Sequence, residues 1–133
     1  MTQLRISDAA QFLGVSDDTV RRWISDGRLS ALKNSSNRAV VDGRELAELA
    51  QSSAASLADP SGVKSSSRNR FAGLVTDVAV DGVMAQVGMQ CGPFRVVSLM
   101  SAEACRELDL QPGSLATASV KATMVTVDTV PTD

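Results

Sequence analysis

The sequence of 133 residues contains no histidine, two cysteines and few aromatic residues, which make up 3 % of the chain. Without histidine there is no Ser-His-Asp or Cys-His nucleophile system, no imidazole general base and no histidine metal ligand. Cys91 and Cys105 lack the spacing of a cysteine-rich zinc site, and we interpret them as buried free thiols in a reducing compartment. The composition therefore predicts that the chain is not an enzyme and coordinates no metal directly.

Long apolar runs and a large net charge are also absent. No run approaches the roughly 20 apolar residues that a membrane span needs, and residues 1–12 do not have the pattern of a signal peptide. We therefore expect a cytoplasmic protein without a membrane partner. The formal charge is only −2, and up to Leu57 the basic and acidic residues are equal in number. If this part of the chain binds nucleic acid, its fold must place the basic side chains apart from the acidic ones.

Changes in composition and hydropathy pattern along the sequence indicate two small domains. Residues 1–51 carry apolar residues at helical spacing. Residues 52–65 are rich in Ser and Ala and have no periodicity that could bury a face, so we expect a flexible linker. Residues 66–133 alternate Val, Thr and Ala with polar residues and contain Asp-Gly, Gly-Pro and Pro-Gly turns, which predict strands. The predicted fold class is α+β, with an α-rich first domain and a β-rich second domain.

Two short helices are predicted in the first domain. Ser7 would cap a helix that ends at Gly14, and Ser16 would cap a second helix over residues 17–26. The apolar stripe of the second helix consists of Val20, Trp23 and Ile24. Two short helices joined by about four residues, with glycine at the bend, form a helix-turn-helix pattern.

A hairpin and a third helix are expected after this pattern. Residues 29–33 and 38–41 flank the polar turn at 34–37, and Asp42 would cap the next helix. The motif S-x-A-x-x-L-G-V-S-x-x-T-x-R-x-W, followed by G-R-L, resembles the MerR-type and excisionase-type winged helix-turn-helix over residues 4–50.

The resemblance implies that the second helix enters the major groove of double-stranded DNA. The candidate DNA-contacting residues are Asp17, Thr19, Arg21, Arg22 and, from the wing, Arg38. The alternative interpretation is that Arg21 and Arg22 only form a solvated helix face.

Alternation and turns predict five short strands and one helix in the second domain. The expected strands are Arg70–Val80, Val83–Met89, Phe94–Met100, Leu115–Lys121 and Met124–Val127. A helix over Ala102–Leu108, capped by Ser101, would precede the fourth strand. This order suggests a small five-stranded OB-like barrel.

The start of the second domain, SSRNRFAG at residues 66–73, resembles the S-A-R-N-x-x-x-G start of the Mop family, also called TOBE or molybdenum–pterin-binding domains. The resemblance continues through the Asp-Gly hairpin, L-x-L-x-P-G from Leu108 and V-K-A from Val120, and covers residues 66–128. It implies a five-stranded OB-like barrel that forms a homo-oligomer, with molybdate or tungstate held between barrels. Family members often carry T-N-E-S where this chain has Ser101 to Ala104. The hydroxyl missing at Ala104 would weaken one type of site.

The residue types in this region suit a tetrahedral dianion. Hydroxyls, a guanidinium fork, a helix-start amide and an ammonium group can all donate to its oxygens. The candidate oxyanion-binding residues are Ser66, Ser67, Arg68, Ser101, Ala102, Lys121, Ala122 and Thr123. The alternative is that Arg68 and Lys121 are ordinary charges of a barrel rim or an intersubunit salt bridge.

These features lead to one main hypothesis and two alternatives. The main hypothesis is a molybdate- or tungstate-responsive transcription regulator that binds promoter DNA and senses the oxyanion at intersubunit sites. The first alternative is an intracellular molybdate storage protein with an accessory helix-turn-helix. The second is an architectural protein whose barrel binds single-stranded nucleic acid, which the shortage of aromatic residues disfavours because only Phe71 and Phe94 are available for stacking.

Overall fold

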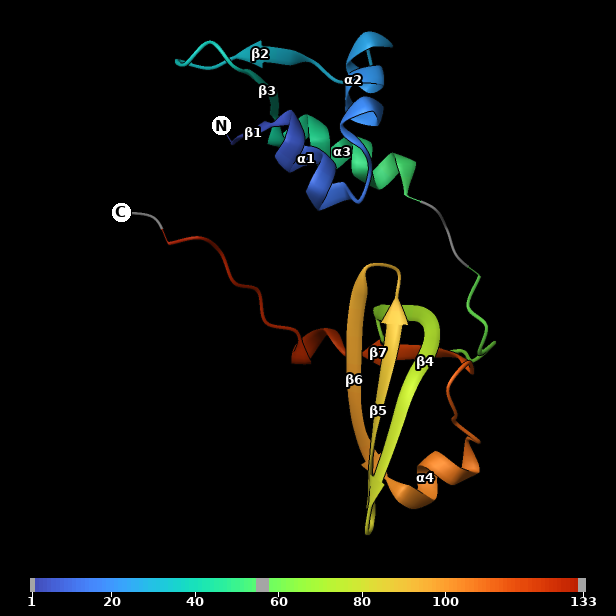
Figure 1. Ribbon diagram of the computed structural model, residues 1–133. Coiled ribbons are helices and arrows are strands. Elements are labelled where there is room, and N and C mark those ends of the chain that lie inside the picture. Colours follow the sequence, from blue (N-terminus) through green and yellow to red (C-terminus); the bar gives the residue numbers. More distant parts are fainter. Residues whose placement is uncertain (1, 55–57, 132–133) are drawn as a thin grey trace. The chain divides into compact units, whose positions relative to one another are not determined.

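The computed structural model describes residues 2–54 and 58–131. The chain divides into two compact units, Met1–Ser56 and Leu57–Asp133. In Figure 1 the first unit runs from blue to green and the second from green to red. The mixed helix-and-sheet class predicted from the sequence is confirmed.

The first unit combines three helices with a small antiparallel sheet. The elements in chain order are β1 (Gln3–Arg5), α1 (Ile6–Leu13), α2 (Asp17–Ser25), β2 (Ala31–Lys33), β3 (Ala39–Asp42) and α3 (Gly43–Ser53). The sheet has the strand order β1-β3-β2, so β3 pairs with both of the other strands. The predicted hairpin is therefore the wing of a winged helix-turn-helix, and its inner strand also pairs with the start of the chain.

One apolar core holds this unit together. Val20 and Trp23 of α2 are buried, as the apolar stripe predicted, and they pack in a cluster with Ile6, Leu29 and Leu46. Burying side chains of this size contributes on the order of 1.5–3 kcal/mol each. The core orients α2 so that its opposite face remains in solvent.

Side-chain caps begin two of the three helices. The Ser16 hydroxyl accepts a hydrogen bond from the Thr19 amide at 3.1 Å, and the Asp42 carboxylate accepts one from the Glu45 amide at 3.3 Å. The predicted cap at Ser7 is wrong. Strand β1 runs directly into α1, so Arg5 takes the cap position without a side-chain hydrogen bond. Three residues are too few for their alternation to have indicated this strand in the sequence.

The second unit is a curled, four-stranded antiparallel sheet with one short helix. Its elements are β4 (Asn69–Asp81), β5 (Met84–Cys91), β6 (Phe94–Ser101), α4 (Ala102–Glu107), β7 (Leu115–Val120) and the 3-10 turn η1 (Ala122–Met124). The strand order is β6-β5-β4-β7, which leaves β6 and β7 as the two edges. The inner face is apolar and is centred on Val75, Val87 and Met89.

Strand β4 bends, so its first half pairs with β7 and its second half with β5. The register shifts between Val75 and Asp77, which is the irregularity that increases local twist. Gly73 lies just before this shift, where a Cβ atom would come within 2.3 Å of the Gln90 carbonyl oxygen. Only glycine permits this close approach of β4 to β5.

The fifth strand predicted near Met124–Val127 is absent from the described chain. Residues 122–124 form η1, and residues 125–131 are extended, exposed and unpaired. The alternating pattern of a strand is present there, but no neighbouring strand of the same chain pairs with it. The OB-like sheet is therefore open on one side.

The stretch between the domains is shorter than the predicted linker over residues 52–65. Helix α3 continues to Ser53, and Asp59 already contacts the second unit through Arg70 and Thr117. None of the described helices has the length and apolarity needed to cross a membrane.

Candidate functional site

The solvent face of α2 carries most of the predicted DNA-contacting residues. Asp17, Arg21 and Arg22 are exposed, while Thr19 is half-buried. The Thr19 hydroxyl lies 3.0 Å from the Ser16 hydroxyl, so it is part of the helix cap. Arginines on the exposed face of a short helix can reach both phosphates and base edges.

The wing presents a second set of cations. Its turn is held by the Asn34 carboxamide oxygen, which accepts hydrogen bonds from the Ser36 and Arg38 amides at 3.0 Å each. Asn37 adopts a φ of 62°, which this turn requires. The Arg38 side chain is exposed, and the exposed Lys33 lies on the opposite strand of the wing. The sequence analysis missed Lys33, although its place before the predicted turn could have indicated it.

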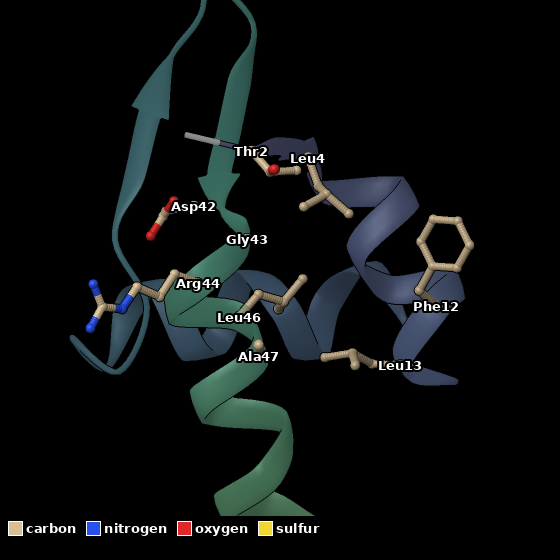
Figure 2. A pocket seen from close by; sticks show the side chains of 9 residues that line it. All are labelled: Thr2, Leu4, Phe12, Leu13, Asp42, Gly43, Arg44, Leu46 and Ala47. Carbon is tan, nitrogen blue, oxygen red and sulfur yellow. The ribbon is translucent and has the colours of Figure 1, made fainter. Parts of the chain in front are cut away.

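An apolar hollow lies on the same unit between α1 and α3. Leu4, Leu13 and Leu46 line it, and Phe12 stands at its rim on α1 (Figure 2). Phe12 is 75 % exposed although it is one of the three phenylalanines of the chain. Sequence reasoning had not singled out this residue, because a helical apolar position ordinarily belongs to the core.

The predicted oxyanion-binding residues fall into two groups, and the first group comes together at one end of the sheet. Residues 66–68 immediately precede β4, and residues 121–123 immediately follow β7. Asn69 pairs with Val120 in the β4–β7 register, and its side-chain amide donates to the Val120 carbonyl at 3.1 Å. This pairing places residues 66–68 and residues 121–123 at the same end of the β4–β7 pair.

The donors of this first group are available for a ligand. Ser66, Arg68 and Lys121 are exposed. Within the described residues, the amides of Ala122 and Thr123 have no hydrogen-bond partner. Three hydroxyls, a guanidinium, an ammonium and two amides suit a tetrahedral oxyanion.

The second group lies at the other end of β4. Ser101 pairs with Met84, and Met84 pairs with Asp81, the last residue of β4. Ser101 and Ala102 are therefore separated from residues 66–68 by the length of a 13-residue strand. One chain does not bring the two groups into a single site.

The start of α4 offers fewer free donors than the sequence predicted. The Ser101 hydroxyl accepts a hydrogen bond from the Ala104 amide at 3.0 Å, and the Ala102 amide donates to the Val83 carbonyl at 2.8 Å. Ala102 is also buried. The expectation of free amides at this helix start is therefore wrong for Ala102 and Ala104.

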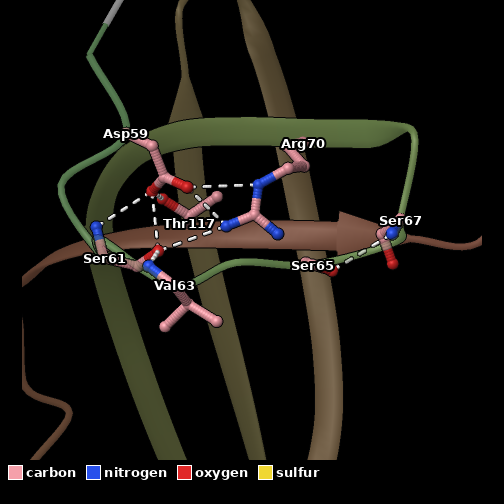
Figure 3. A network of polar contacts seen from close by, with 7 residues as sticks. All are labelled: Asp59, Ser61, Val63, Ser65, Ser67, Arg70 and Thr117. Atoms are coloured by element: carbon pink, nitrogen blue, oxygen red, sulfur yellow. Dashed lines mark hydrogen bonds and ion pairs between the residues drawn. The ribbon is translucent and has the colours of Figure 1, made fainter.

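A polar cluster ties the segment before β4 to the sheet (Figure 3). The Asp59 carboxylate forms an ion pair with Arg70 and accepts a hydrogen bond from the Thr117 hydroxyl at 2.6 Å. The Ser61 amide and hydroxyl also donate to it, at 2.9 and 2.7 Å. Hydrogen bonds from Thr117, then Arg70, then Ser61 hold the pKa of Asp59 well below its usual range.

This cluster, which we call the Asp59 clamp, closes a loop over residues 59–70. The loop contains Ser66, Ser67 and Arg68, the first of the two donor groups. Sequence analysis missed Asp59 because its partners lie 11 and 58 residues away along the chain.

Among the described residues, no group of three or more His, Cys, Asp or Glu side chains is arranged to hold a metal ion. Both cysteines are buried and free, as the sequence analysis expected.

Comparisons with known proteins agree with this division of the chain. Residues 4–54 match the family model of a helix-turn-helix domain, and residues 65–127 match that of the TOBE domain. No curated protein matches the chain.

Three solved structures are similar to the second half of the chain. A molybdate-binding protein from Sporomusa ovata is 33 % identical, covers 50 % of this chain and 100 % of its own, and has a TM-score of 0.49. MopII from Clostridium pasteurianum is 30 % identical over 50 % of this chain and 100 % of its own, with a TM-score of 0.47. The cytoplasmic molybdate-binding protein ModG is 35 % identical over 48 % of this chain and 46 % of its own, with a TM-score of 0.45.

The two matches account for most of the described residues, and the division between the two units after Ser56 falls in the stretch between them. Both matched families are non-catalytic. Through residues 65–127 the chain belongs to the TOBE family, and it joins this domain to an amino-terminal helix-turn-helix domain.

Proposed function

We propose that the chain is a molybdate- or tungstate-responsive transcription regulator that acts in the cytoplasm as a homo-oligomer. The single observation that carries this proposal is the presence of two different recognition surfaces on one chain. Exposed arginines face solvent on the second helix of a helix-turn-helix, and a cluster of anion donors lies at one end of a TOBE domain. The TOBE match supports the choice of ligand, together with two similar solved structures described as molybdate-binding, the Sporomusa ovata protein and ModG.

The oxyanion site would be shared between chains. Ser66, Ser67, Arg68 and Lys121, with the amides of Ala122 and Thr123, would supply one side of it. Ser101 and Ala102 lie at the opposite end of β4, so any contribution from them would come from a neighbouring copy. In that role Ser101 would donate its hydroxyl proton while its oxygen remains the cap of α4.

Double-stranded DNA would bind to the first unit. Arg21 and Arg22 would contact phosphates or guanine edges from α2, and Arg38 would reach the backbone or the minor groove from the wing. The exposed Asp17 would accept a hydrogen bond from a cytosine amino group and oppose binding at other positions. Thr19 would contribute chiefly by holding the start of α2.

Ligand and DNA would be coupled through assembly. An oxyanion shared between chains stabilises the arrangement of subunits that closes its site, by its difference in affinity for the two arrangements. That arrangement sets how many helix-turn-helix units can reach DNA together.

The direct test is the affinity of the purified chain for DNA from upstream of its own gene, with and without micromolar molybdate. We expect molybdate and tungstate to change the affinity at least about fivefold, and sulfate at the same concentration to leave it unchanged. Equal affinities under all these conditions would contradict the sensor function.

Calorimetric titration tests the site itself. Replacing Lys121 by Ala removes a charge-assisted hydrogen bond and should weaken molybdate binding by about ten- to a hundredfold. The matched control is Lys64→Ala, which removes an exposed lysine outside the proposed set. Equal affinities for both variants would show that Lys121 does not touch the ligand.

A storage protein remains the second candidate, and the even charge of the first domain favours it. A DNA-binding module is ordinarily basic, whereas the acids and bases up to Leu57 are equal in number. Molybdate binding at one or more ions per chain, without measurable DNA binding even at low salt, would establish this alternative.

A further inference from the structure

The first unit carries a phenylalanine on a helix face that does not belong to its core. Helix α1 packs against the core through Ile6, Ala10 and Leu13, and Phe12 lies outside this stripe. The Phe12 side chain is 75 % exposed. Because an aromatic side chain can bury about 150–250 Å² of surface, a partner that covered Phe12 would gain hydrophobic free energy.

The hollow between α1 and α3 lies directly beside this exposed ring. It has a volume of about 770 Å³, and Leu4, Leu13 and Leu46 give it an apolar lining. Its two charged side chains, Asp42 and Arg44, lie at the end away from Phe12 (Figure 2). A small-molecule site ordinarily brings a few polar groups together around its ligand. This hollow instead suits an apolar side chain from another protein surface.

We propose that two copies of the first unit pair through this face, with Phe12 of each copy inserted into the hollow of the other. A projecting side chain beside a hollow that fits it is self-complementary. Half a turn about an axis between the two brings the ring of each copy to the hollow of the other. Both contacts then form together, and the pair is closed.

The charges of the first unit favour a second copy as the occupant. Up to Leu57 the acidic and basic residues are equal in number, so two copies approach without net repulsion. The two charged residues of the lining have opposite signs, so each copy brings one cation and one anion to the contact. Nucleic acid or an anionic lipid surface would require a cationic patch, which this lining does not provide.

Pairing through this face would leave α2 free. Arg21 and Arg22 are exposed and do not line the hollow. Two paired units would therefore present two α2 helices at a fixed separation, as binding to two half-sites requires. This consequence rests on the proposed function, whereas the pairing itself requires neither DNA nor an oxyanion.

An interface built around two phenylalanines is small, so free copies should pair weakly. Interfaces at the low end of the size range belong to transient complexes. Copies joined in a homo-oligomer would be held at an effective concentration of roughly millimolar. The test therefore uses the full chain at about millimolar concentration, where the pairing should be populated whether or not the second units assemble.

The first experiment replaces Phe12 by photoreactive benzoylphenylalanine, which keeps an aromatic ring at this position. After irradiation, denaturing electrophoresis should show a covalent dimer, and mass spectrometry should map the link to residues 2–13 or 42–47 of the second chain. The matched control places the same group at Leu32, an exposed apolar residue that does not line the hollow. It should give at least about tenfold less dimer.

The second experiment adds a charge inside the hollow of the photoreactive chain. Ala47 lines the hollow and is exposed, so Ala47→Glu alters this surface without entering the core. We expect it to reduce the dimer yield about tenfold or more, because the incoming ring would bury an unpaired carboxylate. Ala31→Glu makes the same change at an exposed position of β2, outside the lining, and should leave the yield unchanged.

Four results would overturn the proposal. They are the absence of a covalent dimer, equal yields from positions 12 and 32, equal yields from Ala47→Glu and Ala31→Glu, and a link that maps to residues 58–131. The last result would show that the second unit covers the hollow. If Ala47→Glu failed to fold, the comparison of positions 12 and 32 would still decide. None of these measurements uses molybdate or DNA, so the proposed function is judged separately.

Discussion

Asp59 shows how one carboxylate can determine where a linker ends. Its ion pair with Arg70 and its hydrogen bond from Thr117 attach the segment before β4 to the outer side of the β4–β7 pair. The loop that it closes carries Ser66, Ser67 and Arg68. Asp59 is therefore expected to position these donors without touching the ligand.

Replacing Asp59 by Asn should release this loop, because the ion pair with Arg70 is lost and the remaining hydrogen bonds weaken. Trypsin cleavage after Lys64, which lies within the loop, should become about fivefold faster or more. Mass spectrometry of the fragments measures the rate. Asp81→Asn, at the exposed end of β4, is the matched control and should leave the cleavage rate unchanged.

The Asp59 clamp should stabilise the folded chain at neutral pH and lose this effect in acid. The pKa of Asp59 is lower in the folded chain than in the unfolded chain, so the unfolded chain binds more protons as the pH falls. The stabilisation is therefore present above the ordinary aspartate pKa of about 3.9 and is lost as the pH falls below it. The difference in thermal midpoint between the unchanged chain and Asp59→Asn should be present at neutral pH and should shrink below about pH 4.

The third prediction at this scale concerns Arg21 and Arg22. Replacing either by Ala should weaken DNA binding by about five- to a hundredfold, and loss of a phosphate contact should reduce the salt dependence by about one ion. Fluorescence anisotropy at several salt concentrations measures both quantities. Arg44→Ala is the control, because Arg44 is exposed on α3 and pairs with Glu48. If all three variants bind alike, α2 does not face the DNA.

At the scale of the element, Ser16 and Ser7 were both predicted to cap a helix, but only Ser16 does so. Ser16→Ala removes the hydrogen bond to the Thr19 amide and should cost about 1 kcal/mol of helix stability. Ser7→Ala, in the first turn of α1, removes no cap and should cost far less. Hydrogen exchange of the α2 amides, expected to be about fivefold faster for Ser16→Ala, measures the difference. Equal exchange in the two variants would contradict this assignment of the cap.

The elements that the sequence predicted well are those whose signals are local. Ser16, Asp42 and Ser101 each cap a helix within three residues, and the Asp81-Gly82 turn joins adjacent strands. Such contacts depend only on neighbouring residues, so a single sequence contains them.

The elements that the sequence did not predict depend on distant partners. Strand β1 has three residues and exists because β3, far along the chain, pairs with it. The segment at 125–130 has the pattern of a strand, but a pattern does not supply the neighbouring edge. The donor set was predicted as residues of sites between chains, without a placement within one chain, and the register of β4 separates Ser101 from Ser66. Spacing in sequence gave no measure of that separation.

At the scale of the whole molecule, DNA affinity should depend on assembly. One helix-turn-helix unit contacts few phosphates and binds weakly, whereas linked units gain an effective concentration for the second contact. Binding of the unchanged chain to a promoter with two half-sites should therefore be about tenfold tighter or more than its binding to a fragment with a single half-site.

Comparing the two DNA fragments in one titration gives this prediction its control. Equal affinity for the single and the double site would show that each helix-turn-helix unit acts alone.

Trp23 is the one tryptophan of the sequence, and it is buried in the core of the first unit. The sequence also contains no tyrosine, so the emission of the native protein reports on the helix-turn-helix core alone. Heating curves followed by fluorescence and by far-ultraviolet circular dichroism would therefore separate the melting of one unit from that of both. Any influence of an anion bound to the second unit on the helices of the first unit could be observed optically, without a label.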